Sequence, residues 1–163
     1  MTNPVMPKGM RPVTEGYSMS APGGVARTEV AGGMARYGLA WDRGVQTFRV
    51  TMILDDTRFS VWVAFFLHVI KKGSIAFSMP LDSGYGVAPH LCNIVPDSYN
   101  ANRTAGGNYA VSMVVEAESA AYQMTGADAL ALVEFYNEYG RDSDALLARL
   151  HQFSNLDTLV LGA

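Results

Sequence analysis

The stretch FSVWVAFFLHVI, residues 59–70, decides which fold this sequence predicts, because it is the most continuously apolar part of the chain. Two aspartates at residues 55–56 stand before it and offer a helix N-cap. The run Lys-Lys-Gly at residues 71–73 follows it with charges that complement the helix dipole and a glycine suited to the position after a helix. The sequence therefore predicts an apolar helix over residues 56–72.

This helix is too short to span a membrane, and it is apolar on both of its faces, so neither face is expected to remain exposed to water. Twelve residues of α-helix measure about 18 Å, whereas the hydrocarbon core of a bilayer measures roughly 30 Å. One face is wide enough to cover a small sheet and consists of Phe59, Trp62, Val63, Phe66 and Ile70. Val61, Phe65 and His68 lie away from that face. Either the C-terminal helices of the same chain or another subunit is expected to cover them.

Strand patterns surround the predicted helix on both sides. Residues 36–54 alternate between apolar and polar side chains about a turn at residues 42–44, which predicts a β-hairpin with one buried face. Further strands are expected over residues 74–81, 87–95 and 109–118. The order β-β-α-β-β-β predicts an α+β fold for residues 25–119, with an antiparallel β-sandwich or barrel-like core and one packed central helix.

The two ends of the chain differ in composition from this core. Residues 1–24 are dense in proline and glycine, which predicts an extended arm that is either disordered or laid against another surface. Residues 120–163 are rich in helix formers, with Thr125 as an N-cap and Gly140 as a stop. They predict a C-terminal helical extension, folded as an αα-hairpin and followed by a short apolar tail at residues 156–161.

Composition argues against nucleic-acid recognition and for a protein partner. The chain has 163 residues, a net charge of −3, 17% charged residues and 49% hydrophobic ones. No block of basic residues marks a surface for nucleic acid or anionic lipid. A chain with so few charged residues has too few of them to cover its whole surface, so part of that surface is expected to contact a partner. The N-terminal sequence lacks an apolar stretch after a basic start, so we expect the protein to stay in the compartment where it is made.

The motifs of common catalytic and cofactor-binding sites do not occur in the sequence. His90 and Cys92 would share one side of a strand, as a base and a thiol nucleophile might, but no third group to orient them is evident. The three histidines, His68, His90 and His151, are too scattered to indicate a metal site. We therefore expect no catalytic residues, no cofactor and no metal.

Residues 27–118 contain a hairpin reading ARYGLAWDRGVQTFRVTMIL, an aromatic helix ending in KKGS, a strand reading IAFSMPL, and a closing strand GGNYAVSMVVEAE. In these motifs the sequence resembles a group of small structural proteins from the tails of bacteriophages. The C-terminal helices are similar to an extension found in some relatives from short-tailed phages. These motifs are structural positions and not a catalytic signature.

The resemblance implies a virion component that does no chemistry and is assembled in the host cytoplasm. It would form a homo-oligomeric tail ring or tail tube around the DNA exit channel and join other tail proteins. DNA would pass without sequence-specific binding, and no part would insert into a membrane. A head-to-tail connector or tail completion protein is the alternative, and a small cytosolic enzyme using Cys92 is a remote one.

A ring requires each subunit to offer two different complementary surfaces. The apolar arm and the second face of the helix are the expected surfaces. The residues expected at the subunit interface are Val5, Met6, Met10, Tyr17, Val61, Phe65 and His68.

Overall fold

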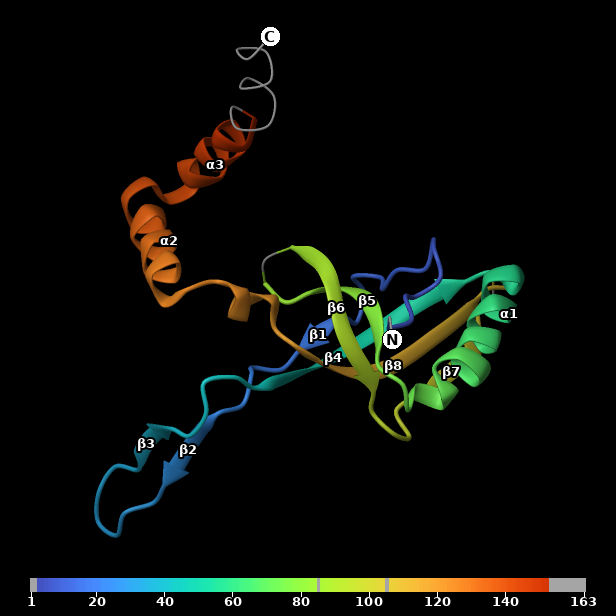
Figure 1. Cartoon of the computed structure of the whole chain (residues 1–163), viewed down its shortest axis with the longest axis horizontal. Coiled ribbons are helices and arrows are strands. Elements are labelled where there is room, and N and C mark those ends of the chain that lie inside the picture. The colour runs from blue at the N-terminus through green and yellow to red at the C-terminus, as the bar shows by residue number, and fades with distance from the viewer. Residues whose placement is uncertain (1–2, 85, 105, 153–163) are drawn as a thin grey trace. The chain divides into compact units, whose positions relative to one another are not determined.

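The structure is a computed structural model, and it describes residues 3–84, 86–104 and 106–152 (Figure 1). The chain divides into two compact units, Met1–Tyr122 and Gln123–Ala163, each described here by itself. The fold is α+β, as predicted, and its first unit contains an antiparallel sheet that curls into a half-barrel. The β-rich core expected from the strand patterns is therefore present.

The sheet is built on two long neighbouring strands, β4 (Val45–Leu54) and β8 (Tyr109–Glu118). The edge of β8 that faces away from β4 pairs with two strands in turn. Its first half pairs with β7 (Asn100–Arg103), and its last residues pair with β6 (Val87–Ile94). The strand β5 (Phe77–Asp82) pairs with β6 and forms one margin of the sheet. At the other margin, the two-residue strand β1 (Ser18–Met19) pairs with β4.

The core lies between the inner face of this sheet and the apolar helix. Along β4 every second side chain is buried and the intervening ones are at least partly exposed, as the alternating sequence predicts. The strand β8 shows the same alternation. The largest fully buried side chains are Trp62, Phe48, Phe77, Met52, Leu54, Ile70, Met79, Leu81 and Met113.

The predicted helix begins as expected but changes its winding halfway. The α-helix α1 (Asp56–Ala64) is capped by Asp55, whose side chain accepts a hydrogen bond of 2.7 Å from the backbone N–H of Arg58. A π-helical turn η1 (Phe65–Val69) follows, and a 3-10 turn η2 (Lys71–Gly73) closes the segment.

The structure corrects the expected position of Phe65. Phe65 follows the buried Trp62 by three residues, and its backbone N–H still bonds to the carbonyl oxygens of Trp62 and Val61, so α-helical spacing places both side chains on one face. Phe65 is 7% exposed and packs edge to face on Phe77, with ring centroids 5.7 Å apart. The expectation that Phe65 lies away from the sheet is therefore wrong.

The predicted hairpin over residues 36–54 is also wrong in its pairing. The strand β3 (Arg36–Leu39) pairs with β2 (Val25–Thr28), and not with β4. These two strands form a separate ribbon, because the turn at residues 42–44 directs the chain into the sheet and does not reverse it onto β3. A Cβ on Gly44 would lie 2.3 Å from the carbonyl oxygen of Gly23, so only glycine permits the close crossing at the base of the ribbon.

The N-terminal strap, which we define as residues 3–20, covers both margins of the sheet. On β5 the N–H of Met6 donates to Ser78 O at 2.9 Å, and the N–H of Ser78 donates to Pro4 O at 2.8 Å. On β4 the N–H of Val13 donates to Thr51 O at 2.8 Å. Exposed strand edges are templates for pairing with other chains, and the strap occupies both of them.

Tyr17 connects the two margins. It lies in the part of the strap that follows β4, yet its hydroxyl donates to the backbone oxygen of Asp82 on β5 at 2.8 Å. The same hydroxyl accepts from the backbone N–H of Asp82 at 2.9 Å. One side chain therefore satisfies both backbone groups of the last residue of β5.

The second unit contains two helices, α2 (Gly126–Tyr139) and α3 (Ser143–Gln152), joined by the short turn η4 (Gly140–Asp142). Another short turn, η3 (Ala120–Gln123), precedes them. Thr125 is the N-cap of α2 as predicted, and its hydroxyl accepts from the N–H of Asp128 at 3.2 Å. No residue of α2 is buried. The predicted apolar tail at residues 156–161 lies outside the described residues.

Candidate subunit interfaces

The four interface candidates of the strap are divided between the surface and the protein's own core. Met6 and Met10 are only 5% and 4% exposed, because they pack into the core of the first unit. Tyr17 is half-buried and bonded to Asp82. Val5 is 68% exposed. Of these four side chains, Val5 is therefore the one that the first unit leaves well exposed to a neighbouring molecule.

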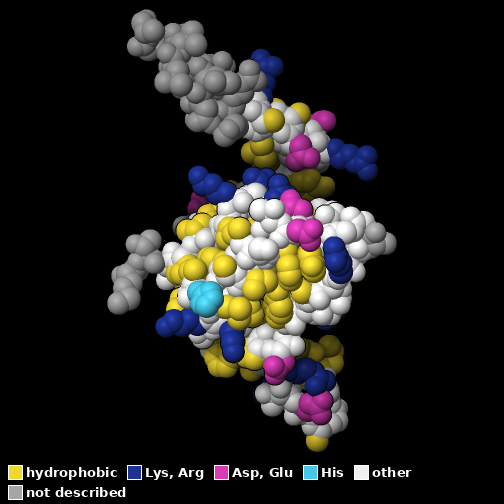
Figure 2. Space-filling model, turned by 90° about the vertical axis from the view of Figure 1, so that its right-hand side faces the viewer, with side chains coloured by type: hydrophobic (Ala, Val, Ile, Leu, Met, Phe, Trp, Pro, Cys, Tyr) yellow, Lys and Arg dark blue, Asp and Glu magenta, His cyan; other side chains and the backbone are white. Residues whose placement is uncertain are grey.

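The helix contributes an exposed apolar surface of its own. Val61 and His68 are exposed, as are Leu67 and Val69, which the sequence did not single out. Phe65, the remaining candidate, is covered by the core. Lys71 and Lys72 follow at the end of the helical segment and are also exposed. We call the exposed part the helix face, formed by Val61, Leu67, His68, Val69, Lys71 and Lys72. The α1 side of the molecule groups hydrophobic side chains, with charged side chains of both signs at their edge (Figure 2).

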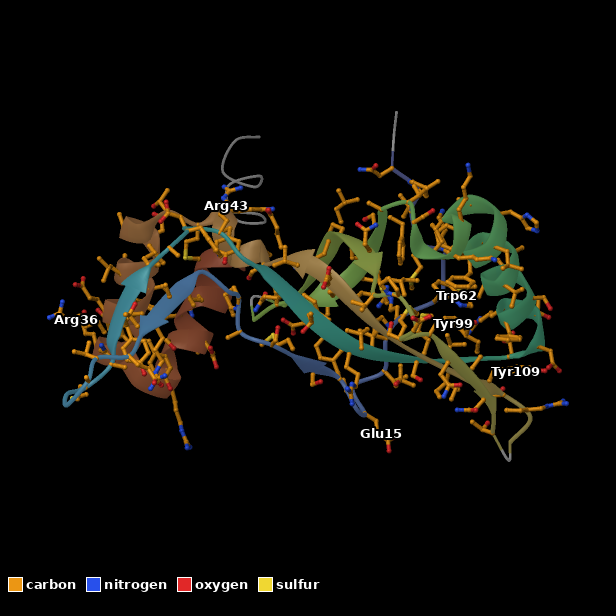
Figure 3. The ribbon with its side chains drawn as sticks, turned by 90° about the horizontal axis from the view of Figure 1, so that it is seen from below. Glu15, Arg36, Arg43, Trp62, Tyr99 and Tyr109 are labelled. Atoms are coloured by element: carbon orange, nitrogen blue, oxygen red, sulfur yellow. The ribbon has the colours of Figure 1, made fainter. Side chains whose placement is uncertain are left out.

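Stacked aromatic rings hold the helix face in place from below. Phe59 stacks on Tyr109 with ring centroids 3.9 Å apart, and Phe66 stacks on Tyr99 at 4.5 Å. Trp62 is fully buried, and its indole N–H lies near the Tyr99 hydroxyl but outside strict hydrogen-bond geometry (Figure 3). Burial raises the pKa of Tyr99, and the neighbouring Trp62 donor partly opposes this shift. The helix face is thus preorganised, which lowers the entropic cost of binding.

The ribbon of β2 and β3 exposes more apolar surface than any sequence pattern suggested. All eight residues of its two strands are exposed. The sequence predicted that Tyr37, Leu39 and Trp41 would share a buried face, whereas their exposed fractions are 67%, 70% and 65%. An isolated two-stranded ribbon is marginally stable in water. The ribbon therefore has the properties of a segment that is completed by another surface.

The ribbon and the helix face lie at opposite ends of the same strand. The ribbon leads into the first residues of β4, and α1 leaves from its last residue. Figures 1 and 3 show the ribbon and α1 at the two ends of the long pair β4–β8. The first unit thus presents two different apolar surfaces that point away from each other.

The second unit also exposes apolar side chains, next to acidic ones. Leu130, Val133 and Tyr136 of α2 are exposed by 65%, 56% and 58%. An open groove of about 330 Å³ lies between α2 and α3. The sequence of α2 contains three acidic residues and no lysine or arginine. The sequence patterns predicted the helices but not this combination of charge and apolar surface.

The His90–Cys92 pair lacks the geometry of a nucleophile and its base. Cys92 is 1% exposed, and its thiol lies 3.4 Å from the backbone oxygen of Phe77. Burial raises the pKa of Cys92 to about 12, so the thiol is protonated at neutral pH. The ring nitrogens of His90 contact Ala88 O at 2.8 Å and Ser83 Oγ at 3.0 Å. Both nitrogens are therefore occupied by groups other than the thiol.

The described residues contain no group of three His, Cys, Asp or Glu side chains placed to hold a metal ion. None of the helices within the same residues has the length and apolarity needed to cross a bilayer.

Comparisons of the chain with protein-family models, with curated proteins and with solved structures found no match.

Proposed function

We propose that this chain is a structural subunit of a bacteriophage tail, which assembles with copies of itself into a ring or tube segment around the DNA exit channel. The observation that supports self-assembly is the pair of apolar surfaces at opposite ends of β4, the ribbon and the helix face. The assignment to a phage tail rests on the sequence resemblance.

Two unlike surfaces on one molecule are what a ring requires. A head-to-tail contact joins different patches on successive subunits, and it closes when the rotation between them divides a full turn. A fully buried Leu or Phe side chain contributes about 1.5–3 kcal/mol relative to an exposed one. Burying Tyr37, Leu39 and Trp41 against a neighbour would therefore offset part of the entropy that association loses.

The strap supports this proposal in a different way from the arm that the sequence predicted. It occupies both margins of the half-barrel. We infer that it completes a barrel-like core within one subunit. Covered edges prevent uncontrolled strand pairing between copies. Assembly would then proceed through side-chain surfaces, with the C-terminal helices as an αα-hairpin attached to that core.

The proposal is also compatible with the acidic net charge of the chain. The chain carries a net charge of −3. A lumen formed by such subunits would not retain DNA by neutralising its phosphates, which is the main source of nonspecific affinity. The subunit would reside in the virion tail after assembly in the host cytoplasm, with other tail proteins as neighbours.

A triple variant of the ribbon tests self-assembly. Tyr37→Ser, Leu39→Ser and Trp41→Ser together should leave the subunit folded, because all three side chains are exposed. Native mass spectrometry should show a ring-sized species for the natural chain and mainly monomer for the variant. Arg36→Ser on the same ribbon is the matched control and should assemble normally.

Two results would contradict the proposal. One is a natural chain that stays monomeric at every concentration tested, and the other is a triple variant that assembles like the natural chain. Immunogold labelling of whole particles tests the tail location separately, and a virion without the protein would exclude it.

A further inference from the structure

Helix α2 carries an acidic rim beside exposed apolar side chains. Leu130, Val133 and Glu134 are spaced at i, i+3 and i+4, so they share one side of the helix, and Glu138 follows one turn after Glu134. Leu130 and Val133 are 65% and 56% exposed. Among the described residues, neither glutamate forms an ion pair. This side of α2 is thus apolar in the middle and negative at its edge.

The helix face has the opposite charge. Val61, Leu67 and Val69 are 47%, 42% and 44% exposed, and Lys71 and Lys72 stand beside them. In the part of the chain that the structure describes, neither lysine has a carboxylate partner within salt-bridge distance.

The basic character is confined to one end of the helical segment. At its start, Arg58 Nε lies 3.6 Å from the carboxylate of Asp55, which balances that charge. At its end, the exposed Lys71 and Lys72 follow the exposed His68. The helix face therefore matches a surface that is apolar in the middle and negative at its edge.

We propose that α2 of one copy docks on the helix face of the next copy, with Glu134 and Glu138 beside Lys71 and Lys72. This inference rests on the proposed self-assembly and names the two surfaces that join successive copies. Charge complementarity favours α2 over the ribbon as the occupant. The ribbon strands contain no acidic residue, and Glu29, which follows β2, is already paired with Arg27. The ribbon would therefore bring the positive charge of Arg36 to the lysines and no carboxylate to pair with them.

The contact is heterologous, because α2 and the helix face are different surfaces of the same chain. Each copy in a ring would give its α2 to one neighbour and receive the α2 of the other. The ribbon, which α2 replaces as the occupant of the helix face, makes a separate contact that the ring also requires. Because the charged residues are exposed, raising the salt concentration should weaken the assembly.

Charge reversal in two full-length variants tests this pairing. The first variant carries Lys71→Glu and Lys72→Glu, and the second carries Glu134→Lys and Glu138→Lys. Each variant alone places like charges across every contact, so its association should be weakened by about tenfold or more. Sedimentation velocity over a range of concentrations measures the loss. The control variant carries Lys8→Glu and Glu15→Lys, which reverse exposed charges outside both surfaces, and it should assemble normally.

An equimolar mixture of the two reversed variants should recover assembly. Alternating copies would place opposite charges across every contact, half of them in the natural arrangement and half inverted. If α2 instead docked on the helix face of its own chain, mixing would restore nothing, and the proposal would be overturned. Reversed variants that assemble like the natural chain would overturn it as well, while leaving self-assembly intact. A natural chain that never assembles would refute both proposals.

Discussion

Replacing Tyr17 by phenylalanine removes the hydroxyl that joins the strap to β5. That hydroxyl makes two hydrogen bonds, of 2.8 and 2.9 Å, to the backbone oxygen and N–H of Asp82. A typical hydrogen bond contributes about 0.5–1.5 kcal/mol to stability, and an unsatisfied buried group costs more. Asp82 is only partly buried, so water can replace some of the loss. We expect a decrease of about 1–2 kcal/mol in the free energy of unfolding.

Urea denaturation followed by circular dichroism, at one low protein concentration, measures this change. Tyr37→Phe is the matched control, because the Tyr37 side chain is exposed and its loss of a hydroxyl should leave stability within about 0.5 kcal/mol. The variant Tyr17→Phe should also melt about 3–10 °C lower. Equal stability of the Tyr17 and Tyr37 variants would refute the conclusion that the strap is held on β5 by this side chain.

The pH dependence of the same pair gives a second measurement. Burial is the main cause that raises the pKa of Tyr17 above its ordinary value of 10.0. A raised pKa contributes stability that is complete below pH 10 and decreases as the pH rises through the shifted value. The Tyr17→Phe variant has no phenol to titrate, so it lacks this pH-dependent contribution to stability. The difference in stability between the natural chain and Tyr17→Phe should therefore shrink above pH 10.

Two further predictions concern the core. Burial raises the pKa of the Cys92 thiol to about 12, so Cys92 should resist iodoacetamide in the native protein and react in concentrated urea. For the same reason, the free energy of unfolding should decrease as the pH rises from about 9 towards 12. Rapid native labelling would contradict this. Gly73→Ala should destabilise by about 2–4 kcal/mol in urea titrations, since Gly73 has a φ of +89° and the new Cβ would lie 2.9 Å from Ile94 Cβ. Gly86→Ala, with a φ of +78° and open space, should cost only about 1 kcal/mol, and equal losses would argue against the contact.

The parts of the fold that the sequence predicted are those in which local pattern and burial coincide. The strand β8 was predicted with its observed bounds, because strict alternation over ten residues permits only one face to be buried. The start of α1 was predicted because Asp55 is a local cap that acts on the N–H three residues later. The cap of α2 at Thr125 is local in the same way.

The errors arise where distant partners decide the structure. The alternation at Tyr37, Leu39 and Trp41 suits an exposed ribbon as well as a buried hairpin, and only the pairing with β2 distinguishes the two. The strand β7 lies in a stretch rich in turn formers, and its register is set by β8. The π-helical turn at Phe65–Val69 left no pattern in the sequence. The error at Phe65 has another cause, because its spacing of three residues from Trp62 already placed both side chains on one helical face.

The candidate interfaces were predictable only in part. Val61 and His68 were expected to lie away from the sheet, beneath the C-terminal helices or another subunit, and both are exposed. Met6 and Met10 were assigned to a neighbour because apolar side chains in an arm indicate some contact, and sequence alone does not say which molecule provides it. Backbone hydrogen bonds from the strap to β4 and β5 make that contact internal, and such bonds leave no pattern of side chains in the sequence.

The strap also constrains the order of events while the protein is being synthesised. Tyr17 leaves the ribosome 65 residues before its partner Asp82, which at about 5–20 residues per second corresponds to roughly 3–13 s of translation. During that interval the nascent strap has no β5 on which to dock. Closure of the half-barrel is therefore a late, long-range step in the maturation of each subunit.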